Sequence, residues 1–394
     1  MNVISLNKTF LDLYQALPEK AFFAPGRINL IGEHLDYNGG HVFPCAITYG
    51  TYAVARKRKD QLVRLYSDNV PEVGVIEFDL HELVYEKDHQ WANYPKGMIH
   101  YIVGAGYKIP NGFECVIKGN IPNGAGLSSS ASIELLMGVL INGLFELDIP
   151  RFELIKMGKR VENEFIGVNS GIMDQFAIGM GKENAAILLD CQTLNYEYAP
   201  IQLDNHKIII MNTNKRRELV DSKYNERREE CKEALAQLQQ KLSVEALGQL
   251  TEEDFEDNKH LISSEIVRKR VRHVVYENNR TLKAFRALKT GDLKLFGELM
   301  NQSHISLRDD YEVTGIELDS LVEVAWKQQG VIGARMTGAG FGGCAIAIVA
   351  NDQVEHFIAN VGEAYLNKIG YEAVFYVASI GDGAKEIEME AVVE

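Results

Sequence analysis

Apolar residues recur at helical spacing at the start of the chain and at strand spacing soon after it. Leu6 and Phe10 lie on one face of an amphipathic helix predicted over residues 1–18. Residues 46–56 and 61–68 alternate apolar and polar side chains, a pattern that predicts paired strands with one buried face. The chain therefore begins as a mixture of helix and sheet.

Shorter apolar runs predict further elements in the first half of the chain. Strands are expected at 21–34 (broken at Pro25-Gly26), 113–118, 184–190 and 206–212. Helices are expected at 128–145 and 151–166.

The pattern changes at about residue 215. Residues 215–300 are rich in Glu, Lys, Arg and Leu at helical spacing and contain no proline, which predicts several helices. Strands follow at 345–349 and 373–377. We therefore expect an α+β protein in two domains, residues 1–205 and 206–394.

Composition narrows the classes of function. The 394 residues carry a formal net charge of -14, which argues against a nucleic-acid partner. No apolar stretch reaches the roughly 18 residues that a membrane span needs, and no signal peptide is recognisable. The five cysteines are widely spaced, which indicates reduced thiols rather than disulfides or a zinc site. We expect a cytoplasmic protein.

A Gly/Ser-rich loop at 119–132 lies between a predicted strand and a predicted helix. Gly124 and Gly126 permit close approach of a ligand, and Ser128 and Ser130 place hydroxyls beside the free N–H groups of the helix start. The helix dipole adds positive potential there, so the loop predicts a phosphate-binding site. It is not a Walker A loop. A plain turn with a serine N-cap remains the alternative.

Polar side chains crowd the segment 25–40. Arg27, Glu33, His34 and Asp36 stand among glycines, which suits a ligand with many hydroxyl groups. The spacing around His34 does not match a zinc site. A solvated loop with a structural arginine is the alternative.

Two more segments carry weaker signals. Asp174 stands in an apolar, glycine-containing stretch at 168–175, where it is either a catalytic base or a helix cap. Four glycines at 336–348 allow close backbone approach, or form a tight turn between strands.

These three segments, in this order, resemble the signature motifs of the GHMP kinase superfamily. The sequence G-R-I-N-L-I-G-E-H-L-D-Y-N-G-G at 26–40 resembles the galactokinase signature in particular. Residues 272–280 and 303–313 also look like galactokinase. The resemblance implies the α+β two-domain GHMP kinase fold, with ATP and sugar in the cleft between the domains.

The resemblance also implies residue roles. Asp174 would be the catalytic base and Arg27 would stabilise the transferring phosphoryl group. The sugar would be held by Glu33, His34, Leu35, Asp36, Gly171 and Tyr224. ATP would be bound by Ser67, Gly124, Ala125, Gly126, Leu127, Ser128, Ser129 and Ser130. Mg²⁺ would be held by Ser130 and Glu162.

The implied reaction is phosphorylation of galactose by MgATP at the anomeric hydroxyl, the first committed step of galactose catabolism. Such transfer depends mainly on alignment and on electrostatic stabilisation, so Asp174 is expected to orient the hydroxyl and to accept its proton late. Three alternatives stay open: a kinase for N-acetylgalactosamine or arabinose, a non-catalytic sugar sensor of the same fold, and a mevalonate-type kinase. The sequence does not indicate the oligomeric state.

Overall fold

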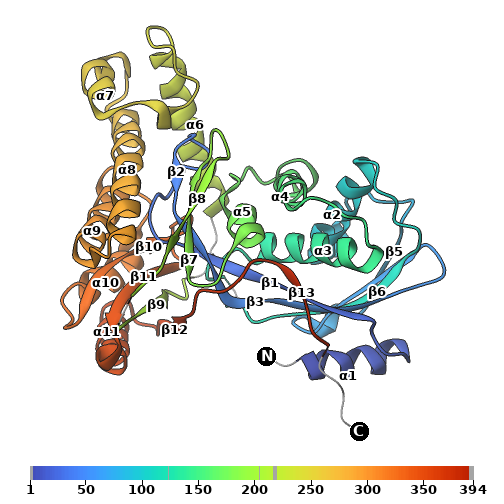
Figure 1. Ribbon diagram of the computed structural model, residues 1–394. Helices are drawn as coiled ribbons and strands as arrows, with labels where there is room; N and C mark the ends of the chain where they lie inside the picture. Colours follow the sequence, from blue (N-terminus) through green and yellow to red (C-terminus); the bar gives the residue numbers. More distant parts are fainter. Residues whose placement is uncertain (1–2, 123, 204, 216–219, 390–394) are drawn as a thin grey trace.

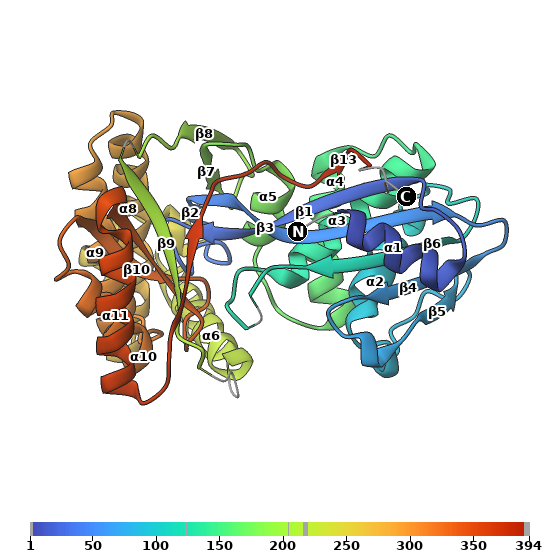
Figure 2. The ribbon, with the colours of Figure 1, turned by 90° about the horizontal axis from the view of Figure 1, so that it is seen from below.

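The computed structural model describes residues 3–122, 124–203, 205–215 and 220–389. Two bodies of helix and sheet lie side by side, with a small three-stranded sheet between them (Figures 1 and 2). The expected α+β architecture is confirmed.

A six-stranded sheet forms the centre of the first body. Its order is β13-β1-β3-β6-β4-β5, and every neighbouring pair is antiparallel except β4 with β6. The strands are β1 (Lys20–Asn29), β3 (Pro44–Lys57), β4 (Leu62–Ser67), β5 (Ile76–Asp79), β6 (Phe113–Gly119) and β13 (Lys385–Ile387). The predicted pairing of 46–56 with 61–68 is wrong, because β6 lies between these two strands.

Helices cover both faces of this sheet. Figure 1 shows α1 on one face and four helices on the other; these four are α2 (Asn93–Gly104), α3 (Ser129–Phe145), α4 (Arg151–Arg160) and α5 (Met173–Met180). The alternation along β3 explains the two layers: Val54 packs in the cluster under α1, whereas Ala53 and Ala55 belong to the main core under α3.

The first helix is shorter than predicted. It spans α1 (Val3–Tyr14), and Leu17 beyond it is 62% exposed. Pro18 accounts for the early end, because a proline ring in a helix clashes with the carbonyl four residues earlier, here that of Tyr14. The predicted helix 151–166 also divides, into α4 and a π-helical turn, η3 (Val161–Ile166).

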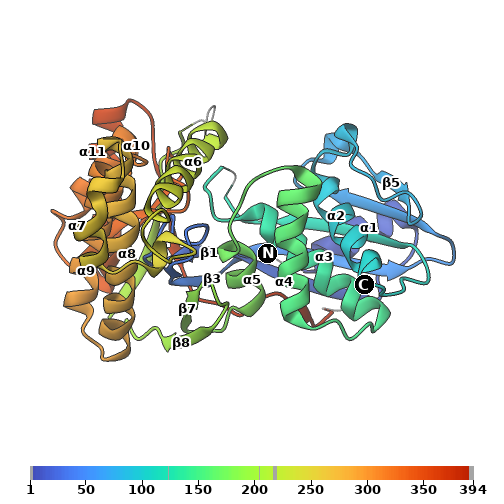
Figure 3. The ribbon, with the colours of Figure 1, turned by 90° about the horizontal axis from the view of Figure 1, so that it is seen from above.

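The second body is a four-stranded antiparallel sheet with the order β10-β11-β9-β12. Its strands are β9 (His206–Asn212), β10 (Val331–Thr337), β11 (Cys344–Ala350) and β12 (Val374–Ala378). The helices of this half are α6 (Val220–Leu238), α7 (Glu252–Asn258), α8 (Glu265–Lys289), α9 (Leu293–Asp309), α10 (Gly315–Ala325) and α11 (Val354–Ile369). Figure 3 shows α8 beside α9 at the outer end of this body.

The small sheet between the bodies consists of β2 (His41–Val42), β7 (Ala185–Asp190) and β8 (Tyr196–Pro200). Short 3₁₀ turns are η1 (Pro71–Val73), η2 (Lys87–Ala92), η4 (Leu247–Gln249), η5 (Lys259–Leu261) and η6 (Asn351–Gln353). No helix in the described part of the chain is long and apolar enough to cross a bilayer.

The chain passes between the bodies more than once. The predicted boundary at 205/206 falls between β8 and β9, and it stays a prediction. The last strand, β13, returns to pair with β1 in the first sheet. Residues 30–40 follow β1 and lead into β2, so this polar segment is held where the two bodies meet.

Candidate active site

The Gly/Ser loop enters α3 through three residues in the left-handed region. Gly124, Gly126 and Ser128 have φ values of 68°, 73° and 64°. A non-glycine residue is strained in this conformation, and such strain concentrates at ligand-binding sites. Ala125 and Leu127 are buried and anchor the loop, whereas Ser129 is exposed at the helix start. This geometry leaves the N-terminus of α3 free to receive an anion.

A bulge in β1 brings Arg27 under this loop. The predicted break at Pro25-Gly26 is a register shift within a continuous strand. Gly26 is required there, because a Cβ would lie 2.7 Å from the carbonyl oxygen of Leu127. The Arg27 amide donates to that same oxygen at 3.2 Å. Strand and phosphate-binding loop are therefore in direct contact.

Arg27 grips Asp174 in a two-pronged ion pair. Its Nε and Nη2 each donate to one carboxylate oxygen at 2.8 Å, and Nη1 donates to the carbonyl of Gly126 at 2.7 Å. Burial opposes the charge on Arg27, but Asp174 more than offsets this and raises the pKa of the guanidinium above its ordinary value. The pair is a preorganised charge centre.

Ser128 has a contact that its sequence position did not suggest. Its hydroxyl donates to Asp174 Oδ2, so the phosphate-binding loop and the predicted base are linked directly. A carboxylate offers about four acceptor sites. Asp174 can therefore hold Arg27 and Ser128 and still accept from a substrate hydroxyl.

Ser130 and Glu162 lie together, as a shared metal site requires. Ser130 Oγ donates to Glu162 Oε1 at 2.7 Å, and Glu162 comes from the π-helical turn after α4. Burial, with a contribution from nearby Asp174, raises the pKa of Glu162. A cation bound beside Glu162 would favour its ionised form and so offset the effect of burial.

The oxygen chemistry of this pair fits Mg²⁺. Mg²⁺ is usually held by one or two protein oxygens together with substrate phosphates and water. Across the described residues, no cluster of three or more His, Cys, Asp or Glu side chains could hold a metal ion. Two oxygen ligands of this kind fit a metal that is also bound by the phosphates of a nucleotide.

Next to the ion pair lies a cavity of about 190 Å³. Its lining includes Arg27, Glu33, His34, Asp36, Glu162, Gly171, Asp174 and Tyr224. The structure thus brings together the predicted catalytic residues and most of the predicted sugar-binding residues. Leu35 differs from them: it is fully buried in the core and does not line the cavity, and its carbonyl accepts from the amides of Asn38 and Gly40.

His34 is held on both sides of its ring. Nε2 lies 3.2 Å from the carbonyl of Ala339, which only accepts, so Nε2 carries the proton. Nδ1 therefore accepts from the hydroxyl of Tyr37 at 2.8 Å, and that hydroxyl lies 2.9 Å from the hydroxyl of Tyr311. Burial lowers the pKa of His34 to about 3, so the ring is neutral at pH 7.

Asp36 and Gly171 are packed against each other. A Cβ on Gly171 would overlap the Asp36 carboxylate, so only glycine fits there. Burial, and then the nearby carboxylates of Asp174 and Glu33, raise the pKa of Asp36 to about 6. Tyr224 of α6 closes the cavity, with its ring 5.7 Å from that of His34.

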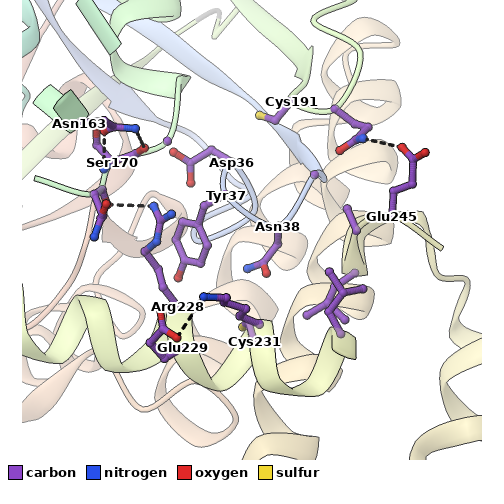
Figure 4. Close-up of a pocket in the computed structure, with 18 of the residues that line it drawn as sticks. Asp36, Tyr37, Asn38, Asn163, Ser170, Cys191, Arg228, Glu229, Cys231 and Glu245 are labelled. Atoms are coloured by element: carbon purple, nitrogen blue, oxygen red, sulfur yellow. Dashed lines mark hydrogen bonds and ion pairs between the residues drawn. The ribbon is translucent and has the colours of Figure 1, made fainter. Parts of the chain in front are cut away.

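A second, larger cavity of about 680 Å³ also has Asp36 in its lining (Figure 4). It shares Asp36, Asn169, Ser170 and Gly171 with the first. Arg228 stands in it beside Tyr37, 5.1 Å from the ring centre, and donates to the carbonyl of Asn169 at 2.9 Å. The small cavity therefore has a larger polar chamber as its neighbour.

Ser67 lies farther along the sheet, at the end of β4. It is buried, pairs with Ile117 of β6, and its Oγ accepts from the amide of Asn69 at 3.3 Å. Since β6 leads into the Gly/Ser loop, Ser67 lies beside the start of that loop. A contact with the nucleotide stays a prediction.

Sequence reasoning missed the partners that hold these residues. The link from Ser128 to Asp174 and the contacts of Tyr37 and Tyr311 are tertiary and have no local pattern. One indication was present in the sequence: Tyr311 lies in the stretch 303–313, which resembles galactokinase but to which no residue role was assigned.

Comparison with known proteins gives consistent matches. Residues 8–57 match the galactokinase galactose-binding signature, 93–182 the N-terminal domain of GHMP kinases, and 284–367 the GHMP kinase C-terminal family. The chain is 61% identical to the galactokinase of Clostridium beijerinckii and 62% identical to that of Exiguobacterium sibiricum. Each alignment covers 98% of this chain and 99% of the relative.

Solved structures agree. The galactokinase of Lactococcus lactis complexed with galactose is 56% identical, with a TM-score of 0.95 over 97% of this chain and 99% of that one. A mevalonate kinase at 21% identity has a TM-score of 0.64 and covers 92% of this chain and all of its own; this likeness concerns the fold alone.

Proposed function

Because the chain belongs to the galactokinase family of the GHMP kinases, we propose that it transfers the γ-phosphoryl group of ATP to the anomeric hydroxyl of galactose. The observation that carries this proposal is the two-pronged ion pair between Arg27 and Asp174, which we call the Arg27–Asp174 fork. The fork lies between the Gly/Ser loop and a small cavity lined by carboxylates. One side of the fork suits a nucleotide phosphate and the other a sugar.

The catalytic roles follow from this placement. The N–H groups at the start of α3 hold the phosphates, and Arg27 offsets the negative charge that spreads over the transferring group. Asp174 orients the sugar hydroxyl and accepts its proton late, as a loose phosphoryl-transfer transition state permits. Holding the hydroxyl in line with the phosphorus supplies the other large part of the rate.

Mg²⁺ is the proposed metal, and Ser130 and Glu162 are its proposed protein ligands. When bound, it would neutralise phosphate charge during the transfer. The support is the hard oxygen chemistry of the two side chains and their contact at 2.7 Å.

The proposed sugar ligands are Glu33, His34, Asp36, Gly171 and Tyr224. They offer carboxylate acceptors at Glu33 and Asp36 and a phenol hydroxyl, which can donate or accept, at Tyr224. Such mixed hydrogen bonding suits a ring of hydroxyl groups.

The cytoplasm is the proposed location. All five cysteines are free thiols, and four of them are buried, which suits a reducing compartment.

A panel of sugars with MgATP tests the activity. ADP release is measured with galactose, arabinose and 2-acetamido-2-deoxygalactose. We expect turnover on galactose and lower turnover on the others. The chamber beside Asp36 is the observation that keeps the 2-acetamido sugar as a second candidate substrate. Sugar binding without ADP release would instead indicate a non-catalytic sensor.

A further inference from the structure

Two sequence stretches that resemble galactokinase have no role in the reaction described above. Residues 272–280 lie on α8 and residues 303–313 begin on α9. Both helices belong to the second body, yet side chains of α8 hydrogen-bond to the backbone of residues 32–33 of the first body, and Ser303 of α9 bonds to one of these side chains. This contact lies directly behind the sugar cavity.

Glu277 makes the first of these contacts. Its Oε1 accepts from the amide of Gly32 at 3.0 Å and from the hydroxyl of Ser303, and its Oε2 accepts from Arg280 at 2.7 Å. The side chain is fully buried. Burial alone would raise the pKa of Glu277, but Arg280 and further positive charge hold it at about 2. Glu277 is therefore ionised at pH 7.

Arg335 of β10 makes the second contact and is also fully buried. Its Nε donates to Ser303 Oγ at 3.2 Å, and its Nη1 donates to the carbonyl of Asn29 at 3.0 Å and to Glu33 Oε1 at 3.3 Å. Ser303 thus joins the two buried charges, since it donates to Glu277 and accepts from Arg335.

This arrangement is a costly way to stabilise a fold. Buried ion pairs often stabilise no more than apolar residues of the same volume. Here Arg335 Nη2 also lacks an acceptor among the residues that the structure describes. A buried charge kept at such a cost calls for a role beyond stability, and the contact of Arg335 Nη1 with Glu33 supplies one.

Glu33 is the only sugar-cavity carboxylate that Arg335 contacts within the described part of the chain. The amide of Gly338 also donates to Glu33 Oε1, at 2.8 Å. The hydrogen bonds to this carboxylate from the described residues therefore all fall on one oxygen. Because Glu33 lines the cavity, Oε2 is the oxygen left for a ligand.

We propose that Arg335, held through Ser303 by Glu277, is a positioning residue that fixes Glu33 Oε1 and so presents Oε2 to a sugar hydroxyl. This inference rests on the proposed function. It gives a role to the stretches 272–280 and 303–313, because Glu277 and Ser303 hold the arginine that orients the Glu33 carboxylate. The catalytic fork of Arg27 and Asp174 is not part of this arrangement.

The test replaces Ser303 by alanine, which removes the link without placing a charge in the core. Ser303→Ala is expected to raise the galactose KM by roughly 10- to 150-fold, the size of one lost hydrogen bond to a charged group. The kcat and the ATP KM should stay within about twofold of wild type, because the fork and the loop are untouched. Ser320→Ala is the matched control, a fully buried helical serine whose hydroxyl bonds to the carbonyl of Ile316.

A double-mutant cycle separates positioning from general stability. Ser303→Ala in a Glu33→Gln background should cost little further galactose affinity, because Ser303 acts through Glu33. The proposal would be overturned if the effects of the two substitutions on the galactose KM multiply in the double mutant. It would also be overturned if Ser303→Ala leaves the galactose KM unchanged, or weakens ATP and galactose binding equally. If Ser303→Ala lacks a cooperative thermal transition, Arg335→Lys takes its place in the same cycle. Wild-type protein that releases no ADP with galactose would refute the proposed function instead.

Discussion

Replacing Asp174 by asparagine removes the anionic acceptor of Arg27 and leaves the shape of the site almost unchanged. The wild-type pair has two hydrogen bonds of 2.8 Å, and its side chains are 6% and 28% exposed. The asparagine amide has one accepting oxygen where the carboxylate has two, so Arg27 keeps only one of its two hydrogen bonds to this side chain. Hydrogen bonds to charged groups contribute about 1.5–3 kcal/mol. With Asp174 partly solvated, we expect the free energy of unfolding to fall by about 1–3 kcal/mol.

The effect on catalysis should be larger than the effect on stability. A positioned general base contributes about 10²–10⁴ in rate, so kcat should fall by that factor, about 2.7–5.4 kcal/mol in the barrier. Galactose binding should weaken less, since the amide still forms hydrogen bonds. Single-turnover ADP release, calorimetric titration with galactose and urea unfolding measure the three quantities separately.

Asp60→Asn is the matched control for this variant. Arg58 forks on Asp60 in the same geometry, but Asp60 is 53% exposed and lies in the connection between β3 and β4, outside the residues that line the cavity. This control should change neither the stability nor the activity measurably. An Asp174→Asn enzyme that keeps kcat within about fivefold of wild type would remove Asp174 from the proton transfer.

Three further predictions concern the edges of the site. Gly171→Ala should raise the galactose KM at least about tenfold, because the new methyl group displaces the Asp36 carboxylate; an unchanged KM in steady-state assays would contradict that contact. Glu162→Gln should raise the Mg²⁺ concentration needed for half-maximal rate by about tenfold with galactose affinity unchanged, as a magnesium titration measures; equal loss of galactose affinity would argue against a metal role. The pKa of Asp36 is raised to about 6, so its carboxylate is protonated below that pH and accepts hydrogen bonds above it. The kcat/KM for galactose should therefore fall as the pH drops through 6, and Asp36→Asn should abolish that limb of the profile.

The local parts of the site could be predicted from the sequence. The glycines and serines of 119–132 indicate their own chemistry, because a strand, a turn and a helix start are all encoded over short distances. The polar run at 25–40 is equally local. The loop lies between a strand and a helix, as its sequence predicts, and the family resemblance supplied the roles of its residues.

Contacts between distant residues could not be predicted. Arg27 and Asp174 are 147 positions apart, and nothing along the chain says that they form a fork. The same holds for Ser128, which was assigned to phosphate but is also bound to Asp174. The role of Arg335 could not be predicted either, because a single arginine in a strand belongs to no recognisable sequence pattern.

Errors in the fold have the same origin. The alternation in 46–56 and 61–68 correctly indicated two strands, but β3 is buried on both faces and the pattern cannot say which strands are neighbours. The chain inserts β6 between them and pairs it parallel with β4. The neighbours in a sheet depend on contacts between residues distant in sequence, which a local pattern does not encode.

The central claim is that a sugar hydroxyl at the anomeric carbon meets the phosphate between Arg27 and Asp174. Incubation of [1-¹³C]galactose with MgATP, followed by ¹³C and ³¹P NMR, tests it most directly. The account predicts one phosphorylated product whose C1 signal is split by coupling to phosphorus, formed in equal amount to ADP. A phosphorylated sugar without that coupling, or ADP formed with galactose unchanged, would contradict it.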